Sequence, residues 1–253
     1  MINKSKYIAA AAQLGPINPE DSKETVISRM FNLLVEAKTQ EAKLVVFPEL
    51  CFTTFFPRYY ITDQAKLDTF YETDIPISIM TEMFELIKEE NIIISFGFAE
   101  NDNGTPFNTS VYVDSSRKLI GKYRKIHLPG HIEYEPQRPF QHLENNTPKH
   151  YPLAPEHDHL QEFHNHLCMQ AGAYANGLWV IASAKAGIED SCELIGGSCI
   201  ISPRGEIVAE ANTTMDELVL AEIDLDECRL IKENIFNFDL HRQPEDYKLL
   251  TQT

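Results

Sequence analysis

Hydrophobic positions along the chain follow two periods, one typical of buried strands and one typical of amphipathic helices. The apolar run Tyr7–Leu14 stops at a Gly-Pro pair and predicts a buried strand, and Lys43–Phe47 predicts a second. Between them, Glu20–Thr39 has apolar residues spaced along one helical face, with Asp21 or Ser22 placed to cap the helix. A strand, a helix and a strand in this order predict a crossover unit.

The alternation of elements continues to the end of the chain. Further helices are expected over Ile79–Glu90, Leu160–Asn176 and Asp226–Asn234. Further strands are expected over Asn91–Ala99, Thr109–Asp114, Leu119–Arg124, Trp179–Ala184, Ser198–Ser202, Glu206–Ala209 and Leu218–Ile223. No repeat or linker interrupts the series, so we expect a single mixed α/β domain over residues 1–253.

Composition narrows the class of protein. The chain has 22 Lys+Arg against 38 Asp+Glu, a net charge of −16, which argues against a nucleic acid or an anionic membrane as partner. It contains no run of about 18 apolar residues and starts with a polar segment, so we expect no membrane span and no secretory leader. Five cysteines without paired spacing indicate a reducing compartment, and we expect a cytoplasmic protein.

Glu49 is the first candidate for chemistry, because it follows a buried strand directly after Pro48. Open α/β sheets place functional groups at the carboxyl ends of their strands. The neighbouring phenylalanines predict partial burial, which would raise the pKa of the carboxyl group and suit it to general-base work. An acid that only caps the following turn gives the same pattern, so Glu49 by itself leaves both interpretations open.

Lys125 is the second candidate, in the segment KYRKIHLPG at the end of another predicted strand. An ammonium group there can stabilise an oxyanion if it is desolvated and paired with a carboxylate. An ordinary basic surface loop is the alternative.

Histidines crowd the middle of the chain and raise the question of a metal site. The pairs His157-Asp158-His159 and His164-Asn165-His166 bring potential ligands close in sequence. Residues two apart on a helix point to different faces, however, and no His-Glu-x-x-His pattern is present. We therefore expect no metal ion.

Taken together, VVFPEL around Glu49, KYRKIHLPG around Lys125 and HLE at positions 142–144 resemble the carbon–nitrogen hydrolase (nitrilase) superfamily. Longer segments, among them PELCFTTFFPRYY, FNTSVYVD, MQAGAYANG and IFNFDLHRQP, are similar to N-carbamoyl-D-amino-acid amidohydrolases. The resemblance implies an α-β-β-α sandwich that forms homo-oligomers, dimers or tetramers. It also implies hydrolysis of an N-carbamoyl amino acid, or a related amide, to amino acid, ammonia and carbon dioxide, with no metal or organic cofactor.

The resemblance also assigns roles by position. It implies a catalytic set of Glu49 as the base, Lys125 as the lysine and Glu144 as the second glutamate. The candidate substrate-binding residues are His127, His142, Asn146 and Thr147.

The family's nucleophile is a cysteine in a Cys-Asn/Asp-x-Arg motif, and this chain has no such motif. After Glu144 it runs directly into Asn145-Asn146-Thr147-Pro148, which resembles the loop that follows the nucleophile-bearing unit. A typical relative has roughly fifty more residues here, enough for a strand, a helix and another strand. We therefore expect a sandwich incomplete by one such unit, with a deletion junction near residues 144–146.

Two hypotheses follow from the missing motif. The chain belongs to an enzyme lineage acting on carbamoylated amino acids, here without catalysis, or it is a non-catalytic relic or pseudoenzyme that binds a ligand or a partner subunit. The cysteines are expected to be packing residues or idle thiols; they are Cys51, Cys168, Cys192, Cys199 and Cys228. Because a lost strand exposes sheet edges and an apolar face, we expect rearranged pairing around residues 144–151 or a break in the chain there.

Overall fold

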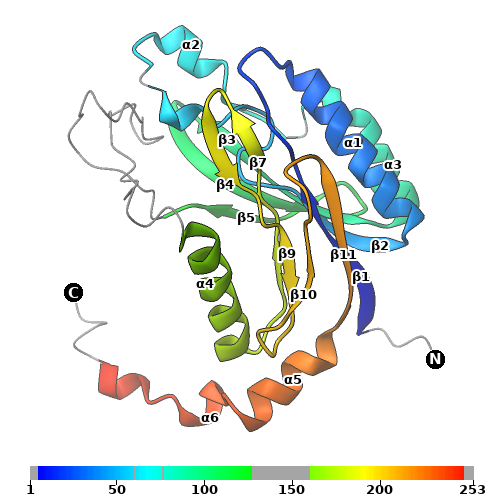
Figure 1. Ribbon diagram of the computed structural model, residues 1–253, viewed down its shortest axis with the longest axis vertical. Coiled ribbons are helices and arrows are strands. Elements are labelled where there is room, and N and C mark those ends of the chain that lie inside the picture. The colour runs from blue at the N-terminus through cyan, green and yellow to red at the C-terminus, as the bar shows by residue number, and fades with distance from the viewer. Residues whose placement is uncertain (1–4, 60, 76, 127–159, 248–253) are drawn as a thin grey trace.

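The computed structural model in Figure 1 describes residues 5–59, 61–75, 77–126 and 160–247. Its strands are β1 Lys6–Gln13, β2 Ala42–Val46, β3 Ile93–Asp102, β4 Thr105–Val113, β5 Leu119–Arg124, β6 Val180–Ala182, β7 Ala186–Glu189, β8 Cys192–Ile195, β9 Cys199–Ile201, β10 Ile207–Glu210 and β11 Glu217–Asp224. Its α-helices are α1 Lys23–Thr39, α2 Gln64–Asp68, α3 Thr81–Glu90, α4 Gln161–Asn176, α5 Leu225–Asn234 and α6 Phe238–His241.

The larger sheet has six strands in the order β11-β1-β2-β3-β4-β5. Strands β1, β2 and β3 pair in parallel, and the β1–α1–β2 segment is the predicted crossover unit. Strand β11 on one side, and β4 and β5 on the other, add to this centre in antiparallel pairing. The sheet is therefore mixed, as the sequence predicted. Ser22 caps α1 by accepting a hydrogen bond from the Thr25 amide.

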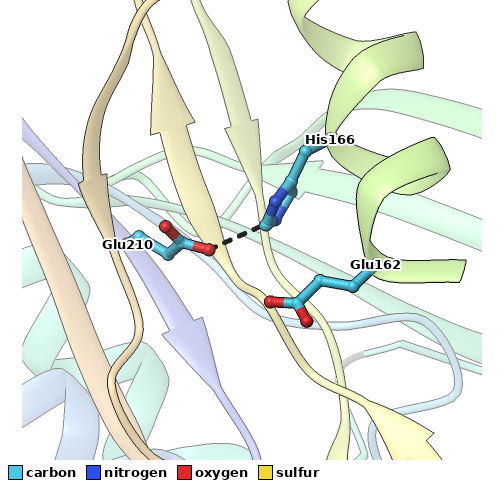
Figure 2. Close-up of side chains that lie close together, drawn as sticks. All are labelled: Glu162, His166 and Glu210. Atoms are coloured by element: carbon cyan, nitrogen blue, oxygen red, sulfur yellow. Dashed lines mark ion pairs between the residues drawn. The ribbon is translucent and has the colours of Figure 1, made fainter. Parts of the chain in front are cut away.

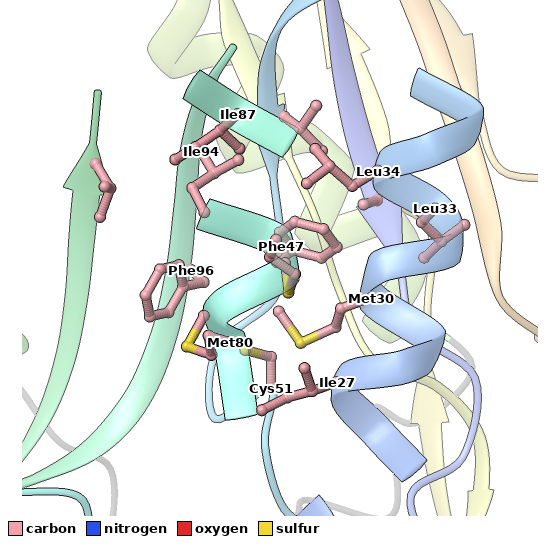
Figure 3. Packing of buried hydrophobic residues seen from close by; sticks show 14 of the residues in the cluster. Ile27, Met30, Leu33, Leu34, Phe47, Cys51, Met80, Ile87, Ile94 and Phe96 are labelled. Carbon is pink, nitrogen blue, oxygen red and sulfur yellow. The ribbon is translucent and has the colours of Figure 1, made fainter. Parts of the chain in front are cut away.

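The described elements form four layers. Helices α1 and α3 pack on one face of the six-stranded sheet, where Met30, Leu34 and Ile87 meet the sheet residues Ile94 and Phe96 in the main core (Figure 3). The opposite face packs against a three-stranded antiparallel sheet, β10-β9-β6, whose outer face carries α4.

Alternation within the strands explains how each sheet serves two layers. In β1, Ala10 and Ala12 belong to the core beneath α1, whereas Ala9 and Ala11 face the second sheet. Strand β9 behaves likewise on the side of α4. The order of layers is helix, sheet, sheet, helix, which confirms the predicted fold class.

The second sheet is smaller than the first. Strand β6 is its edge, and among the described residues no strand pairs with the outer side of β6. The expected deletion junction at residues 144–146 lies outside the described residues. The same holds for residues 144–151, where we expect rearranged pairing or a break in the chain. Within the described ranges no helix is long and apolar enough to cross a membrane.

Candidate active site

Glu49 stands on a tight loop that β3 supports from below. After β2, the chain turns at Leu50, whose φ of +47° is left-handed. The loop binds Gly97 of β3 twice: the Gly97 amide donates to the Pro48 carbonyl at 3.0 Å, and the Cys51 amide donates to the Gly97 carbonyl at 2.8 Å. A Cβ atom on residue 97 would lie 2.7 Å from the Glu49 Cα, so only glycine allows this approach.

The structure brings Glu49 and Lys125 together from distant parts of the sequence. The Lys125 Nζ lies 2.9 Å from Glu49 Oε1. Asn108 in β4 joins the two residues, because its side-chain amide donates to the same Glu49 oxygen and its carbonyl accepts the Lys125 backbone amide at 2.8 Å. Both of these hydrogen bonds reach Glu49 Oε1, and the described residues provide none to Oε2.

Glu49 lies partly open to solvent. Its side chain is 46% exposed and that of Lys125 is 37% exposed, so the carboxylate is only half-buried. Phe52 packs into the main core and Phe56 into a separate cluster, whereas Phe47 and Phe55 line cavities together with Glu49.

Two cavities meet at Glu49. One, of about 320 Å³, is lined by residues of β3, β4 and β5 together with Lys125, Asn108 and Tyr123. The other, of about 420 Å³, extends toward α4 and the β7–β8 hairpin and includes Phe55, Lys185 and Cys192. The carboxylate is therefore accessible from both sides.

A buried ion pair anchors the loop that follows Glu49. Glu189, fully buried, lies 2.6 Å from Lys185 Nζ and accepts hydrogen bonds from the backbone amides of Phe55 and Ile17. Lys185 also donates to the Thr53 carbonyl at 2.8 Å. Burial lowers the pKa of Lys185, and the Glu189 carboxylate opposes this shift. The β7 strand thus fixes the wall of the larger cavity.

The five cysteines are unpaired and differ in their surroundings. Cys51 is fully buried in the main core, and burial raises the pKa of its thiol. Cys199 is buried between β6 and β10, where burial, and then the charge of Glu210, raise its pKa to about 11. Cys192 is the one described cysteine that lines a cavity with Glu49.

The remaining predicted site residues cannot be placed. Five of them lie outside the described residues: His127, His142, Glu144, Asn146 and Thr147. Asn108 contacts Glu49, but the sequence did not single it out as a site residue. It stands within the FNTSVYVD segment, but nothing in that segment indicates that its side chain reaches Glu49. A group of three potential metal ligands among the described residues lies elsewhere, between α4 and β10.

Comparisons with known proteins agree with this architecture. The family model described as carbon-nitrogen hydrolase matches two overlapping segments, residues 8–155 and 145–233. The chain is 27% identical to a nitrilase of Pyrococcus abyssi (strain GE5 / Orsay), with 94% of this chain and 97% of the relative covered. It is 25% identical to an N-carbamoylputrescine amidase of Oryza sativa subsp. japonica, with 97% and 95% covered.

A solved structure shares the fold. The crystal structure of a carbon-nitrogen hydrolase from Helicobacter pylori G27 superimposes with a TM-score of 0.73 at 18% identity, covering 99% of this chain and all of the other. The layered fold and the family match together define the class: this chain belongs to the carbon–nitrogen hydrolase family. The alignment with the rice relative runs over 295 positions, so at least 42 of them hold no residue of this 253-residue chain.

Proposed function

We propose that this chain binds an N-carbamoyl amino acid, or a related small amide, against the paired side chains of Glu49 and Lys125. The observation that carries the proposal is the 2.9 Å contact between the two side chains at the meeting point of two cavities. A ureido group has N–H donors that suit a carboxylate and a carbonyl oxygen that suits an ammonium group. The rice relative named N-carbamoylputrescine amidase supports a carbamoyl ligand.

In the lineage that the resemblance implies, a glutamate takes the proton of a cysteine thiol, and the thiolate attacks the carbamoyl carbon. The lysine stabilises the tetrahedral oxyanion, which collapses to a carbamoyl thioester as the amino acid leaves with the proton that the glutamate took. Water then hydrolyses the thioester, which restores the thiol and releases carbamate that decomposes to carbon dioxide and ammonia. We assign the base to Glu49 and the oxyanion contact to Lys125. Glu144 is the proposed second glutamate, and the proposed substrate contacts are His127, His142, Asn146 and Thr147.

We further propose that the chain lacks catalysis because the nucleophile-bearing segment is deleted. Supporting observations are the missing Cys-Asn/Asp-x-Arg motif, the family match in two segments that meet at residues 145–155, and alignments longer than the chain. The outer side of β6, which no described strand pairs, fits the loss of a neighbouring strand. The chain then acts as a ligand-binding relic of the enzyme, and its five free cysteines fit a cytoplasmic location.

A second candidate function is residual hydrolysis by another thiol. Cys192 is the residue that favours it, because it lines the same cavity of about 420 Å³ as Glu49. Cys51 and Cys199 are buried, and burial raises the pKa of both thiols, which makes them poor nucleophiles.

Two measurements on the purified chain separate these functions. Calorimetric titration with N-carbamoyl-D-alanine is expected to give binding that Glu49→Gln and Lys125→Met weaken at least about tenfold, since each removes a charge-assisted hydrogen bond. Lys118→Met, in the exposed turn before β5, is the matched control and is expected to bind normally. Unchanged affinity in both site variants would contradict the proposed site.

Ammonia release from the same compound tests catalysis. We expect none from the wild-type chain. Release that disappears in Cys192→Ser would establish the second function instead, and release that persists after each of the five cysteines is replaced would exclude a thiol mechanism.

A further inference from the structure

Three side chains able to ligate a metal meet away from Glu49, at the contact between α4 and the second sheet. Glu162 and His166 stand one turn apart on α4, and Glu210 closes β10 opposite them. Figure 2 shows the three side chains pointing toward one another across the gap between the helix and the strand. One potential ligand atom of each lies within 4.8 Å of the other two.

The part of the chain that the structure describes supplies no lysine or arginine to balance the charges of this group. Within the described residues, neither Glu162 nor Glu210 forms an ion pair with a lysine or arginine, and the partner of Glu210 is His166, at 3.5 Å from Nε2 to Oε1. Two carboxylates at such a short separation repel one another unless a cation lies between them. The start of α4 favours Glu162 as an anion through the helix dipole, but it offers nothing comparable to Glu210.

The imidazole of His166 is buried, while the two carboxylates are exposed and free to adjust. His166 is 9% exposed, and its Nε2 lies 3.1 Å from the Gly197 carbonyl oxygen. Gly197 has a φ of +64°, and a Cβ there would lie 3.0 Å from that nitrogen, so the backbone at residue 197 packs directly against the imidazole ring. Glu162 and Glu210 are exposed residues whose rotamers can close on a common centre.

We propose that Glu162, His166 and Glu210 bind a divalent transition-metal ion that ties α4 to β10. Two carboxylates and an imidazole suit Zn²⁺ or Mn²⁺ better than Mg²⁺ or Ca²⁺, which prefer oxygen ligands alone. With metal–ligand bonds of about 2.0–2.2 Å, ligand atoms around one ion lie about 3–4 Å apart, so small rotamer changes of the two glutamates complete the set. His166 exchanges its contact with the Gly197 carbonyl for the ion, and water fills the open positions.

The proposed role is structural, because α4 is weakly anchored without it. Of its 16 residues, only His166 and Ala173 are buried, whereas Phe163, Leu167 and Tyr174 are 41–58% exposed. An ion bound by the folded state alone stabilises that state in proportion to its affinity and concentration. The sequence prediction of no metal rested on two His-x-His pairs and on the missing His-Glu-x-x-His pattern. His164 is exposed and His166 is buried, so that pair does face differently, but the prediction did not weigh the Glu162-x-x-x-His166 spacing on one helical face.

Metal titration of the chelator-treated full chain tests the proposal. Zn²⁺ or Mn²⁺ is expected to raise the midpoint of thermal unfolding of the wild-type chain, with Mg²⁺ giving no such shift. Glu162→Gln and Glu210→Gln are each expected to lose this shift and to bind the ion at least about tenfold more weakly by calorimetry. Glu206→Gln is the matched control and keeps the wild-type response, because Glu206 is an exposed glutamate directly before β10.

Cobalt provides a readout that does not depend on stability. Co²⁺ bound by one imidazole and two carboxylates is expected to give visible absorption in the wild-type chain and in Glu206→Gln, and to lose it in the Glu162 and Glu210 variants. A shift of the wild-type size in both variants would assign the ion to other histidines or thiols and overturn the site. No shift and no absorption in the wild-type chain would leave a His166–Glu210 ion pair only, which also overturns it.

Discussion

Gly97 fixes the position of Glu49 at the scale of single residues. A Cβ at position 97 would lie 2.7 Å from the Glu49 Cα and 3.0 Å from the Pro48 carbonyl oxygen, and both are backbone atoms that no rotamer change can move away. Gly97→Ala is therefore expected to destabilise the fold by about 1–3 kcal/mol, measured by urea unfolding. It is also expected to weaken ligand binding at Glu49.

The matched control for this substitution is Gly172→Ala. Gly172 stands inside α4 with no atom within 4 Å of its would-be Cβ, so alanine there is expected to stabilise the protein by up to about 1 kcal/mol. Equal stability of the two variants would mean that the Glu49 loop does not rest on β3 as described.

A second prediction concerns Glu100, which we expect to make the free energy of unfolding fall in acid. This carboxylate is 6% exposed; burial acts to raise its pKa, but hydrogen bonds from Arg124, Lys122 and Thr109 outweigh burial and lower the pKa to about 2. A carboxyl group with a lowered pKa stabilises the fold fully above its ordinary pKa of 4.5. We expect this contribution, at most about 3 kcal/mol, to disappear as the pH falls from 4.5 toward 2.

Urea unfolding of Glu100→Gln at several pH values checks this sign. The variant is expected to be less stable than the wild-type chain at pH 7 and to approach it as the pH falls toward 2. Glu85→Gln, which breaks an exposed pair with Arg117, is the control and is expected to change stability by about 0–1 kcal/mol at any pH. A constant difference between Glu100→Gln and the wild-type chain across this range would show that Glu100 keeps an ordinary pKa.

At the scale of elements, hydrophobic periodicity predicted most strands and helices because it reports burial directly. Strand β5 has the predicted bounds, and α4 ends at Gly177 with a left-handed φ of +54°, as expected of a helix end. The hairpin of β3 and β4 is tighter than predicted, because residues 101 and 102 continue the strand and pair with 106 and 105. The sequence does not indicate this pairing, because the residues at the end of a long hairpin are polar on both faces and hydrophobic and polar positions no longer alternate there.

The β7–β8 hairpin was missed for a related reason. Its strands have four residues each, and its turn residues Asp190 and Ser191 have φ values of +42° and +66° without the Asn-Gly or Asp-Gly signal of such turns. This hairpin carries Glu189, Cys192 and much of the larger cavity wall, so sequence reasoning missed this part of the site as well as Asn108. No local pattern could supply it, because Glu189 satisfies amides of residues 17 and 55 that are distant in sequence.

The turn conformation leads to a prediction at this scale. Ser191→Gly is expected to raise stability by about 0.5–1 kcal/mol, because glycine adopts a φ of +66° without the strain that a Cβ creates. Ser191→Ala, which removes only the hydroxyl group, is expected to bring no such gain. Thermal unfolding of both variants tests this prediction. Equal changes in the unfolding midpoint would mean that the loss of the hydroxyl group, rather than relief of backbone strain, causes the change in stability.

At the scale of the whole molecule, the layered architecture follows from alternation along the strands, but the candidate site does not. Glu49 and Lys125 could each be singled out because each follows a predicted strand, and the sheet order β2-β3-β4-β5 then brings them within 2.9 Å of one another. The intervening Asn108 has no pattern of its own, since its role depends on the register of β4 against both neighbours. Sequence therefore predicted the charged pair but not the side chain that joins it.

The apolar surface leads to the last prediction, which concerns assembly. Large apolar side chains are exposed along α4, α5 and α6, which lie together on one side of the molecule in Figure 1; they include Phe163, Leu167, Leu225, Leu230, Ile235, Phe238 and Leu240. The ring of Tyr174 on α4 packs at 5.1 Å against Phe236 between α5 and α6, so these helices form one continuous surface. Exposed apolar surfaces of this kind mark interaction sites.

We expect the chain to form a homo-oligomer through this surface, and light scattering after size exclusion to give a mass of at least two chains. Leu230→Lys and Leu240→Lys are expected to lower that mass, because each would bury a charge in an apolar contact. Val35→Lys, an equally apolar exposed site on α1 in the opposite outer layer, is expected to leave it unchanged. A single-chain mass for the wild-type protein would contradict the assembly. In that case only the repulsion between molecules that each carry a net charge of −16 would oppose contact between their exposed apolar helices.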